Sequence, residues 1–151
     1  MPEGTVNDVS FTGRHKYNVD DKGRITLPYK TTDQLLVVVW PWSKAGTCLR
    51  VLPPAQAEKL MRDMDNIPNS DPGKSALKRH VGSNSVRVKT DSVGRISIPS
   101  EMLEEAALKG ESIVAGMSDK FEIWNPGRYK ELKKQDLAVM EEAGTVKHIE
   151  S

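Results

Sequence analysis

The sequence contains very little cysteine, and this shortage excludes several classes of protein. Its single cysteine, Cys48, cannot form an internal disulfide. None of the three histidines stands at metal-ligand spacing from a cysteine or a carboxylate pair, so we expect no metal and no other cofactor. Because Cys48 precedes Leu49 in an apparent strand, we interpret it as a small core residue and not as a functional thiol.

A long apolar run is also missing. The longest one, Leu35–Trp40, is far too short for a helix that crosses a bilayer, which takes about 20 apolar residues. Residues 1–10 do not contain a basic region followed by an apolar stretch, the pattern of a secretion signal. We therefore expect a cytoplasmic protein that does not contact the membrane.

The motifs of common enzyme classes are absent too. The chain has no G-x-x-x-x-G-K-[ST], no G-x-S-x-G and no H-E-x-x-H, and no constellation of acid, base and nucleophile is visible. Aromatic residues make up only 5% of the chain, which suits a small β-rich protein better than an enzyme with a large apolar substrate pocket. We expect a protein that is not an enzyme.

What the chain does contain is a duplication. The segment YNVDDKGRITLP at residues 17–28 is repeated as VKTDSVGRISIP at 88–99, and LRVLPPAQAEKL at 49–60 aligns with FEIWNPGRYKEL at 121–132. The first pair of matching segments is 71 positions apart and the second pair is 72 positions apart. These nearly equal offsets indicate one structural unit of about 70 residues that occurs twice. Because neither half alone would bury a sufficient core, we expect the strands of both halves to interleave in a common core.

The coarse pattern places strands, helices and turns in each half. Each repeated motif predicts two short strands on either side of a tight turn, and further strand pairs are expected at 35–40 with 47–52 and at 113–115 with 121–124. Helices are expected at 55–64, 74–81, 101–108 (with Gly110 as its stop) and 129–143. The domain boundaries that follow are a flexible extension 1–10, a first unit 11–75 with its linker, a second unit 76–142 and a tail 143–151.

The repeated pattern D-x-x-G-R has a physical logic. Glycine tolerates the positive φ that a tight turn demands, and the aspartate can accept backbone N–H groups of the turn and pair with the arginine four positions later. The arginine then leaves the turn on a stiff strand, with a planar fork of donors that suits phosphate or a guanine edge. The alternative is a pair of turn-stabilising ion pairs, but such surface pairs contribute only about 0 to 1 kcal/mol, so a shared ligand-facing role is favoured.

Charge is distributed unevenly along the chain. The formal net charge is only +1, but residues 11–30 carry a balance of +3, residues 74–95 carry +5 and the chain from 100 onward carries −4. Positive charge therefore gathers around the repeated motif, as expected for a surface that binds nucleic acid. Ordinary solvated lysines and arginines are the alternative interpretation of the same distribution.

Over residues 11 to about 142 the chain resembles the MraZ family of bacterial transcriptional regulators, which are built from two SpoVT/AbrB-like units. The resemblance is carried by F-T-G at 11–13, DDKGRITLP, the strand LRVLP, DSVGRISIP and FEIW. It implies an α+β, β-rich fold in which two swapped-hairpin halves form a pseudo-twofold barrel with flanking helices. The extension before Phe11 departs from the family, whose members usually begin almost at this point.

The resemblance also implies a function. Members bind repeated DNA boxes upstream of the division and cell-wall gene cluster, often including their own gene, as ring-like homo-oligomers, which places the protein at the nucleoid. Carried over by position, the expected DNA-binding residues are Arg24, Arg95, Lys22, Arg14, Lys16 and Lys89, and the turn-structuring residues are Asp20, Gly23, Asp91 and Gly94. Val93 stands where the first motif has Lys22, so we expect the two turns to contact DNA unequally.

An interaction module remains as the second hypothesis. In an AbrB-like antitoxin or assembly scaffold the same fold would bind a protein partner, through residues 65–75 and the acidic carboxyl-terminal helix. For the subunit interface of an oligomer the candidates are Trp40-Pro41-Trp42 and that same helix, whereas Trp124 is expected in the core.

Overall fold

The computed structural model describes residues 10–149 of the chain. Within this range the strands are β1 (Arg14–Val19), β2 (Arg24–Thr26), β3 (Leu35–Trp40), β4 (Cys48–Leu52), β5 (Ser85–Val88), β6 (Arg95–Ser97), β7 (Gly110–Gly116) and β8 (Phe121–Trp124). The helices are α1 (Pro54–Asp65), α2 (Gly73–Ser83), α3 (Ser100–Glu105) and α4 (Pro126–Ala143), followed by a 3-10 helix at Thr145–His148. The predicted α+β class is confirmed, and none of these helices is long and apolar enough to cross a membrane.

One antiparallel sheet of six strands organises the molecule, in the order β1-β7-β8-β4-β3-β5. The duplication relates β1, β3 and β4 of the first half to β5, β7 and β8 of the second. Exchanging these strands gives the same order read from the other edge of the sheet. A pseudo-twofold axis therefore passes between β4 and β8. The first strand of each half pairs with the third strand of the other half, β1 with β7 and β5 with β3. The halves therefore interleave, as the duplication predicts.

A second, two-stranded sheet covers the inner face of the large one. Strands β2 and β6 pair with each other, Ile25 opposite Ile96 at the centre. Both isoleucines point inward and are almost completely buried. They pack with Val37, Val51 and other residues of the large sheet in the main apolar cluster. The alternation of buried and exposed residues in these short strands thus fixes which side chains face the core.

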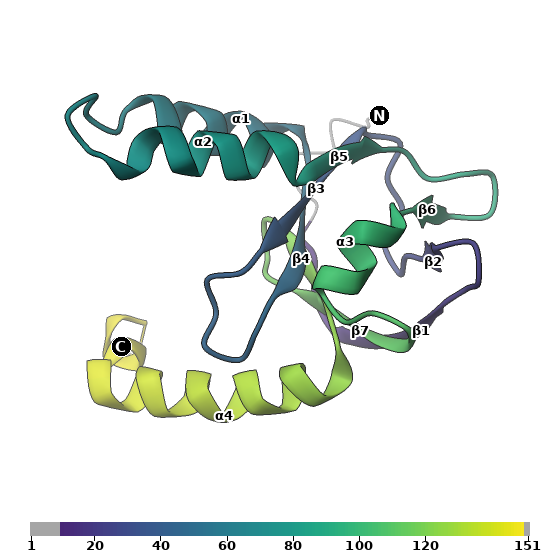
Figure 1. Cartoon of the computed structure of the whole chain (residues 1–151). Helices are drawn as coiled ribbons and strands as arrows, with labels where there is room; N and C mark the ends of the chain where they lie inside the picture. The colour runs from purple at the N-terminus through teal and green to yellow at the C-terminus, as the bar shows by residue number, and fades with distance from the viewer. Residues whose placement is uncertain (1–9, 150–151) are drawn as a thin grey trace, which may run out of the picture.

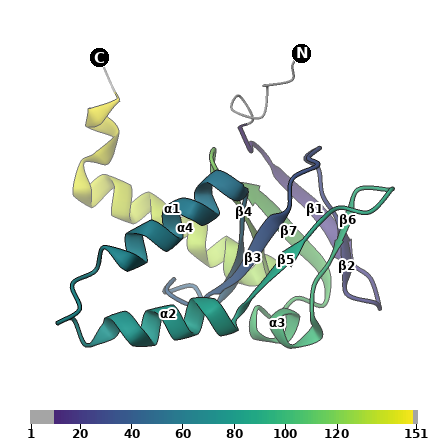
Figure 2. The ribbon, with the colours of Figure 1, turned by 90° about the horizontal axis from the view of Figure 1, so that it is seen from above.

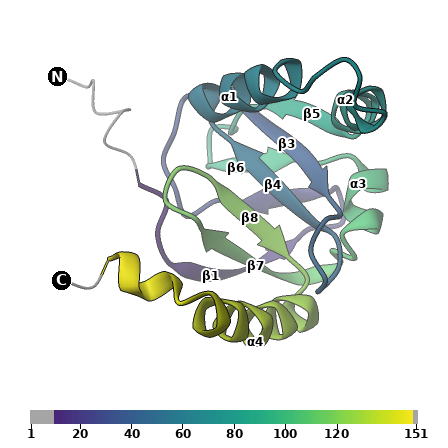
Figure 3. The same cartoon turned by 90° about the vertical axis from the view of Figure 1, so that its left-hand side faces the viewer.

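Helices cover the outer face of the large sheet in two separate patches. A hairpin of α1 and α2 packs over β3 and β4 through Leu36, Val38 and Met64. Helix α4 packs over Cys48, Ile113 and its neighbours on the other part of the sheet. Figures 1 and 3 show α1 and α2 along one border of the sheet and α4 along the opposite border.

Among the described residues the paired strands do not close into a ring, and in place of the expected barrel a two-stranded sheet packs on one face of the six-stranded sheet. Strands β1 and β5 are the edges of the six-stranded sheet, and β2 and β6 pair only with each other. The physical reason lies in the turns that follow β1 and β5. In each turn the aspartate N–H donates to the arginine carbonyl, but the pairing with the preceding strand stops there, because β2 and β6 form their ladder with each other.

Two local predictions also need correction. Helix α3 ends at Glu105 and not at Leu108, and Ala107, with φ 53°, already lies in the left-handed region before Gly110, the predicted helix stop. Gly110 instead begins β7, which is longer than predicted. The loop between α1 and α2 lies where the sequence places the linker, at residues 67–73. The predicted flexible extension lies outside the described residues, apart from Ser10.

The predicted roles of Cys48 and Trp124 as core residues are confirmed. Cys48 is fully buried, and burial raises the pKa of its thiol far above the ordinary value, with the nearby Glu122 carboxylate as a smaller cause. A thiol held in its neutral form is a poor nucleophile. Trp124 is 1% exposed and packs in the cluster under α4.

Candidate nucleic-acid interface

The first repeated turn, residues 20–24, is held together by its aspartate. Oδ1 of Asp20 accepts the backbone N–H groups of Lys22 and Arg24 at 2.9 and 2.8 Å, and Oδ2 accepts Nε–H of Arg24 at 2.8 Å. Gly23 takes a φ of 77° at the reversal. One carboxylate therefore both shapes the turn and orients the arginine.

The second turn, residues 91–95, repeats these contacts almost atom for atom. Oδ1 of Asp91 accepts the N–H groups of Val93 and Arg95 at 3.0 and 2.9 Å, and Oδ2 accepts Nε–H of Arg95 at 2.9 Å. Gly94 has a φ of 85°. The pKa of each aspartate is lowered, chiefly by the hydrogen bond from the arginine backbone N–H and further by the arginine side chain. Both carboxylates are therefore ionised at neutral pH.

Each aspartate uses only one guanidinium nitrogen of its arginine. Within residues 10–149, the Nη groups of Arg24 and Arg95 donate no hydrogen bond to the protein, while Nε is held. About a third of each arginine side chain is exposed. Because four N–H donors of each guanidinium remain available in a fixed orientation, each arginine can bind a phosphate or a base edge with two parallel hydrogen bonds.

The pairing of β2 with β6 brings the two arginines together. Arg24 lies opposite Ser97, and Thr26 lies opposite Arg95. Because these four residues alternate with the buried isoleucines, all four project from the outer side of the ribbon; we call this surface the arginine face. On it the arginines are diagonal neighbours, a relation that usually spans roughly 7 to 8 Å.

The two turns lie at opposite ends of this ribbon. The N–H of Leu27 donates to the Gly94 carbonyl, and the N–H of Ile98 donates to the Gly23 carbonyl, so the antiparallel pairing continues into both turns. Figures 1 and 2 show the two turns projecting from the side of the molecule that is remote from α1, α2 and α4. The result is a narrow, basic, solvent-facing ridge of two strands.

Of the four other predicted basic residues, two lie beside the arginine face and two lie away from it. Lys22 is exposed in the first turn, and Lys89 lines a hollow of about 440 Å³ together with Arg95. Arg14 and Lys16 are exposed on β1, opposite Ala115 and Ile113 in the pairing with β7. Ile113 and Ala115 belong to the cluster under α4, so Arg14 and Lys16 stand on the outer side of the large sheet and not on the arginine face.

Sequence reasoning missed three residues of this region. Thr26 and Ser97 place hydroxyl groups between the arginines, and the alternation in RIT and RIS could have identified them. Arg87 lines the same hollow as Lys89. Its exposed position on an edge strand gave no local signal that it stands near the second turn.

The strand order and the paired turns define a duplicated α+β protein with one basic ribbon as its distinctive surface. The family model described as "MraZ protein, putative antitoxin-like" matches residues 83–147. The chain is 33% identical over 120 residues to a transcriptional regulator MraZ of Saccharopolyspora erythraea, covering 80% of this chain and 84% of that protein. It is 30% identical over 141 residues to its counterpart in Halothermothrix orenii, covering 89% and 99%.

A transcriptional regulator MraZ of Mycobacterium sp. strain KMS is 32% identical over 124 residues, with 82% of this chain and 87% of that protein covered. These three matches each span at least 80% of this chain and at least 84% of the relative. The chain belongs to the MraZ family.

Proposed function

We propose that this protein is a sequence-specific DNA-binding regulator of transcription and that the arginine face is its DNA contact. The observation that carries the proposal is the joint orientation of Arg24 and Arg95. Each is fixed by an aspartate through Nε alone, and both project from the same side of one two-stranded ribbon. The names of the curated relatives, all transcriptional regulators, support the same function.

The shape of the ribbon fits this role. The major groove of B-DNA admits a two-stranded antiparallel ribbon, and arginine pairs with the O6 and N7 atoms of guanine through two hydrogen bonds. Lys22 and Lys89 extend the basic surface at the two ends and suit phosphate contacts. We assign Arg14 and Lys16 a smaller, peripheral role because β1 presents them on the other side of the sheet.

One arginine face is small for specific binding. Specific protein-DNA interfaces usually bury about 1,000 Å² of protein surface or more, so several subunits must act together. We propose a homo-oligomer, a ring in its simplest form, that binds direct repeats. The resemblance to MraZ proteins supports boxes upstream of the division and cell-wall genes, including the protein's own gene, and a place at the nucleoid in the cytoplasm.

Exposed apolar side chains supply a candidate interface for this oligomer. Leu137 and Val139 on α4 are 58% and 61% exposed, and Trp42 is 51% exposed beside Trp40. Apolar side chains gathered on an exposed helix favour association with another protein surface. The proposed organisation is two AbrB-like swapped-hairpin units, 11–75 and 76–142, fused in one chain and repeated by the oligomer.

A protein-binding role is the second candidate. The family description "putative antitoxin-like" and the exposed apolar residues of α4 favour it. An interaction module would not bind DNA by itself in a salt-dependent and sequence-dependent manner. Binding of the purified protein to the region upstream of its own gene, measured across a salt series, separates the two functions.

The residue-level test compares Arg24→Ala and Arg95→Ala with Arg62→Ala, a control that removes an exposed arginine of α1. Loss of a guanine contact should weaken binding by about 1 to 3 kcal/mol in a base-dependent way, and loss of a phosphate contact should lower the salt slope by about one. All three variants should keep the wild-type thermal stability. Wild-type DNA affinity in both turn variants would contradict the proposal and leave the turns as structural ion pairs.

A further inference from the structure

The two halves differ at one place beside the ribbon. Leu35 of β3 pairs with Val88 of β5, and the equivalent pair in the other half is Ser112 of β7 with Tyr17 of β1. Leu35 follows its motif proline, Pro28, by seven positions, whereas Ser112 follows Pro99 by thirteen. The six additional residues of the second half equal the length of α3, which has no counterpart in the first half.

Helix α3 supports the first turn. A Cβ atom at Gly23 would lie 3.3 Å from Cδ1 of Leu103, whereas a Cβ atom at Gly94 would have no described neighbour within 4 Å. The place equivalent to α3, beside the second turn, is a hollow of about 1050 Å³. We call it the second-turn hollow.

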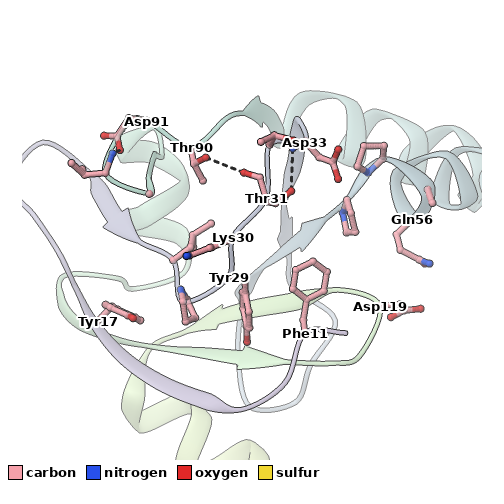
Figure 4. A pocket seen from close by; sticks show the side chains of 18 of the residues that line it. Phe11, Tyr17, Tyr29, Lys30, Thr31, Asp33, Gln56, Thr90, Asp91 and Asp119 are labelled. Atoms are coloured by element: carbon pink, nitrogen blue, oxygen red, sulfur yellow. Dashed lines mark hydrogen bonds between the residues drawn. The ribbon is translucent and has the colours of Figure 1, made fainter. Parts of the chain in front are cut away.

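The lining of the second-turn hollow comes from five parts of the chain. It includes residues 28–33, which replace α3 in the sequence, residues 90–94 of the second turn, and the start of α1. Phe11, Tyr17 and Leu27 contribute apolar surface. Figure 4 shows Phe11, Tyr29 and Tyr17 on one side of the hollow and Thr90 and Asp91 on another, with Thr90 donating to the Thr31 carbonyl at 3.2 Å.

We propose that the amino-terminal segment, residues 1–9, docks in the second-turn hollow and supports the second turn as α3 supports the first. The segment is joined through Ser10 to Phe11, whose side chain lines the hollow. Nine residues reach about 30 Å when extended, and α3 fills the equivalent place with six. The attachment point and the length therefore both suit this occupant.

The apolar residues of the segment match the template that α3 provides. Leu103 packs beside the first turn, and Ala106, three positions further along, is buried in the same apolar cluster. Val6 and Val9 repeat this spacing in the segment. Because the segment is tethered at the rim of the hollow, its effective concentration there is high, and weak apolar contacts suffice to hold it.

Docking has a consequence for DNA binding, which rests on the proposed function. Arg95 leaves the second turn, and a turn without packing behind it opens more easily than the first. An occupied hollow would hold both arginines with similar firmness. The segment is then a positioning element of the DNA-binding surface and does not itself contact DNA.

The test measures amide hydrogen exchange without DNA. The N–H groups of Val93 and Arg95, which donate to Asp91, report on the second turn, and those of Lys22 and Arg24 report on the first. Deleting residues 2–9 should accelerate exchange in the second turn by about tenfold and leave the first unchanged. Equal exchange in the deletion variant and the full chain, or equal acceleration in both turns, would overturn the proposal.

Point variants separate docking from charge. Val6→Asp with Val9→Asp should reproduce the effect of the deletion, whereas Thr5→Asp with Asn7→Asp adds the same charge but keeps both valines and should not. Adding a synthetic peptide of residues 1–9 at millimolar concentration to the deletion variant should restore protection of the second turn. Failure of the peptide to restore it, or equal effects of the two double variants, counts against docking.

A DNA titration of the deletion variant then tests the link to function. The positioning role is supported if both variants, the deletion and Val6→Asp with Val9→Asp, bind DNA more weakly than the full chain and by the same factor. Accelerated exchange with unchanged DNA affinity would leave docking in place and contradict the assignment of the second turn to DNA. Failure of docking and failure of the proposed function are thus distinguishable.

Discussion

Arg50 and Glu122 face each other across β4 and β8 on the axis that relates the two halves, with Nε 2.7 Å from Oε2. They are 72 positions apart and occupy corresponding places in the repeated LRVL and FEIW segments. Two identical repeats would have placed like charges here. The two copies differ at this place, and the difference gives a complementary pair that two identical repeats could not form.

The pair should be strongly coupled. Glu122 is almost buried and also accepts Nε1–H of Trp124 at 2.8 Å, so Arg50→Met leaves an unpaired charge and should cost about 3 kcal/mol of unfolding free energy. Arg50→Met with Glu122→Gln should recover much of this loss, because the amide oxygen can still accept from Trp124. Urea unfolding of the full mutant cycle measures the coupling, and additive effects would show that the pair contributes little.

The two turn glycines should respond differently to alanine. Both have positive φ, so each substitution should cost about 1 to 2 kcal/mol of backbone strain. At Gly23 the new Cβ would also lie 2.7 Å from the Ile98 carbonyl oxygen, whereas at Gly94 it meets no described atom. Gly23→Ala should therefore be the more destabilising, by at least about 1 kcal/mol in thermal or urea unfolding. Equal losses would contradict the difference in packing between the turns.

A lysine in the second turn should strengthen DNA binding. Val93 is 63% exposed and stands where the first turn has Lys22. Val93→Lys should tighten binding and steepen the salt dependence by about one unit, because one more phosphate can be neutralised. Met117→Lys, on an exposed apolar residue of the loop between β7 and β8, is the matched control. The same gain in both variants would indicate a general effect of charge and not a contact of the turn.

The same reasoning predicts that Arg24→Ala harms DNA binding more than Arg95→Ala. Lys22 adds a second cation beside Arg24, so the first turn should contribute the larger share of the contact. Fluorescence anisotropy at one salt concentration compares the two variants directly. The reverse order would show that the second turn is the dominant one.

Acid should weaken the first turn through Asp20. Its pKa is lowered in the folded state, first by the backbone N–H of Arg24, so its stabilising contribution is present above the unfolded pKa of about 4 and is lost as the pH falls through the lowered folded value. Asp20→Asn should reduce the loss of stability between pH 6 and pH 3. Asp21→Asn, which removes an exposed carboxylate of the same turn, is the control. Urea midpoints at the two pH values provide the comparison.

Avidity should depend on the spacing of the DNA boxes. An oligomer that presents identical ridges at regular intervals should lose most of its avidity when two boxes are moved by half a helical turn, about 5 base pairs, and less when they are moved by a full turn. Leu137→Asp, at an exposed residue of α4, should reduce both assembly in light scattering and the preference for two boxes. Equal affinity of the wild type for one box and for two would exclude the mechanism.

Several features of the fold and the site could be predicted because they depend on residues close together in the chain. The hydrogen bonds of Asp20 and Asp91 reach no further than four positions, and the requirement for glycine comes from the local φ. The strand pairs β3 with β4 and β7 with β8 are joined by short loops, which also makes them local. Apolar runs such as LLVVVW identify strands that are buried on both faces.

The partners of the first two strands could not be predicted in this way. Local proximity favours pairing of β1 with β2 across the first turn, but β1 pairs with β7 and β2 pairs with β6. These choices depend on burying both isoleucines of the ribbon against the large sheet. The end of α3 could not be predicted either. Helix ends are usually marked by a glycine in the left-handed region, but here Ala107 takes that conformation.

The sequence by itself determined that the chain is a duplication, that each copy carries an aspartate-braced arginine turn, and which family it belongs to, because repeats and short-range hydrogen bonds are written in consecutive residues. Only the tertiary structure decided that Arg24 and Arg95 share one face, that Arg14 and Lys16 do not, and that a hollow replaces a helix beside the second turn. These features follow from long-range strand register and from the packing of one half against the other, which no local pattern encodes.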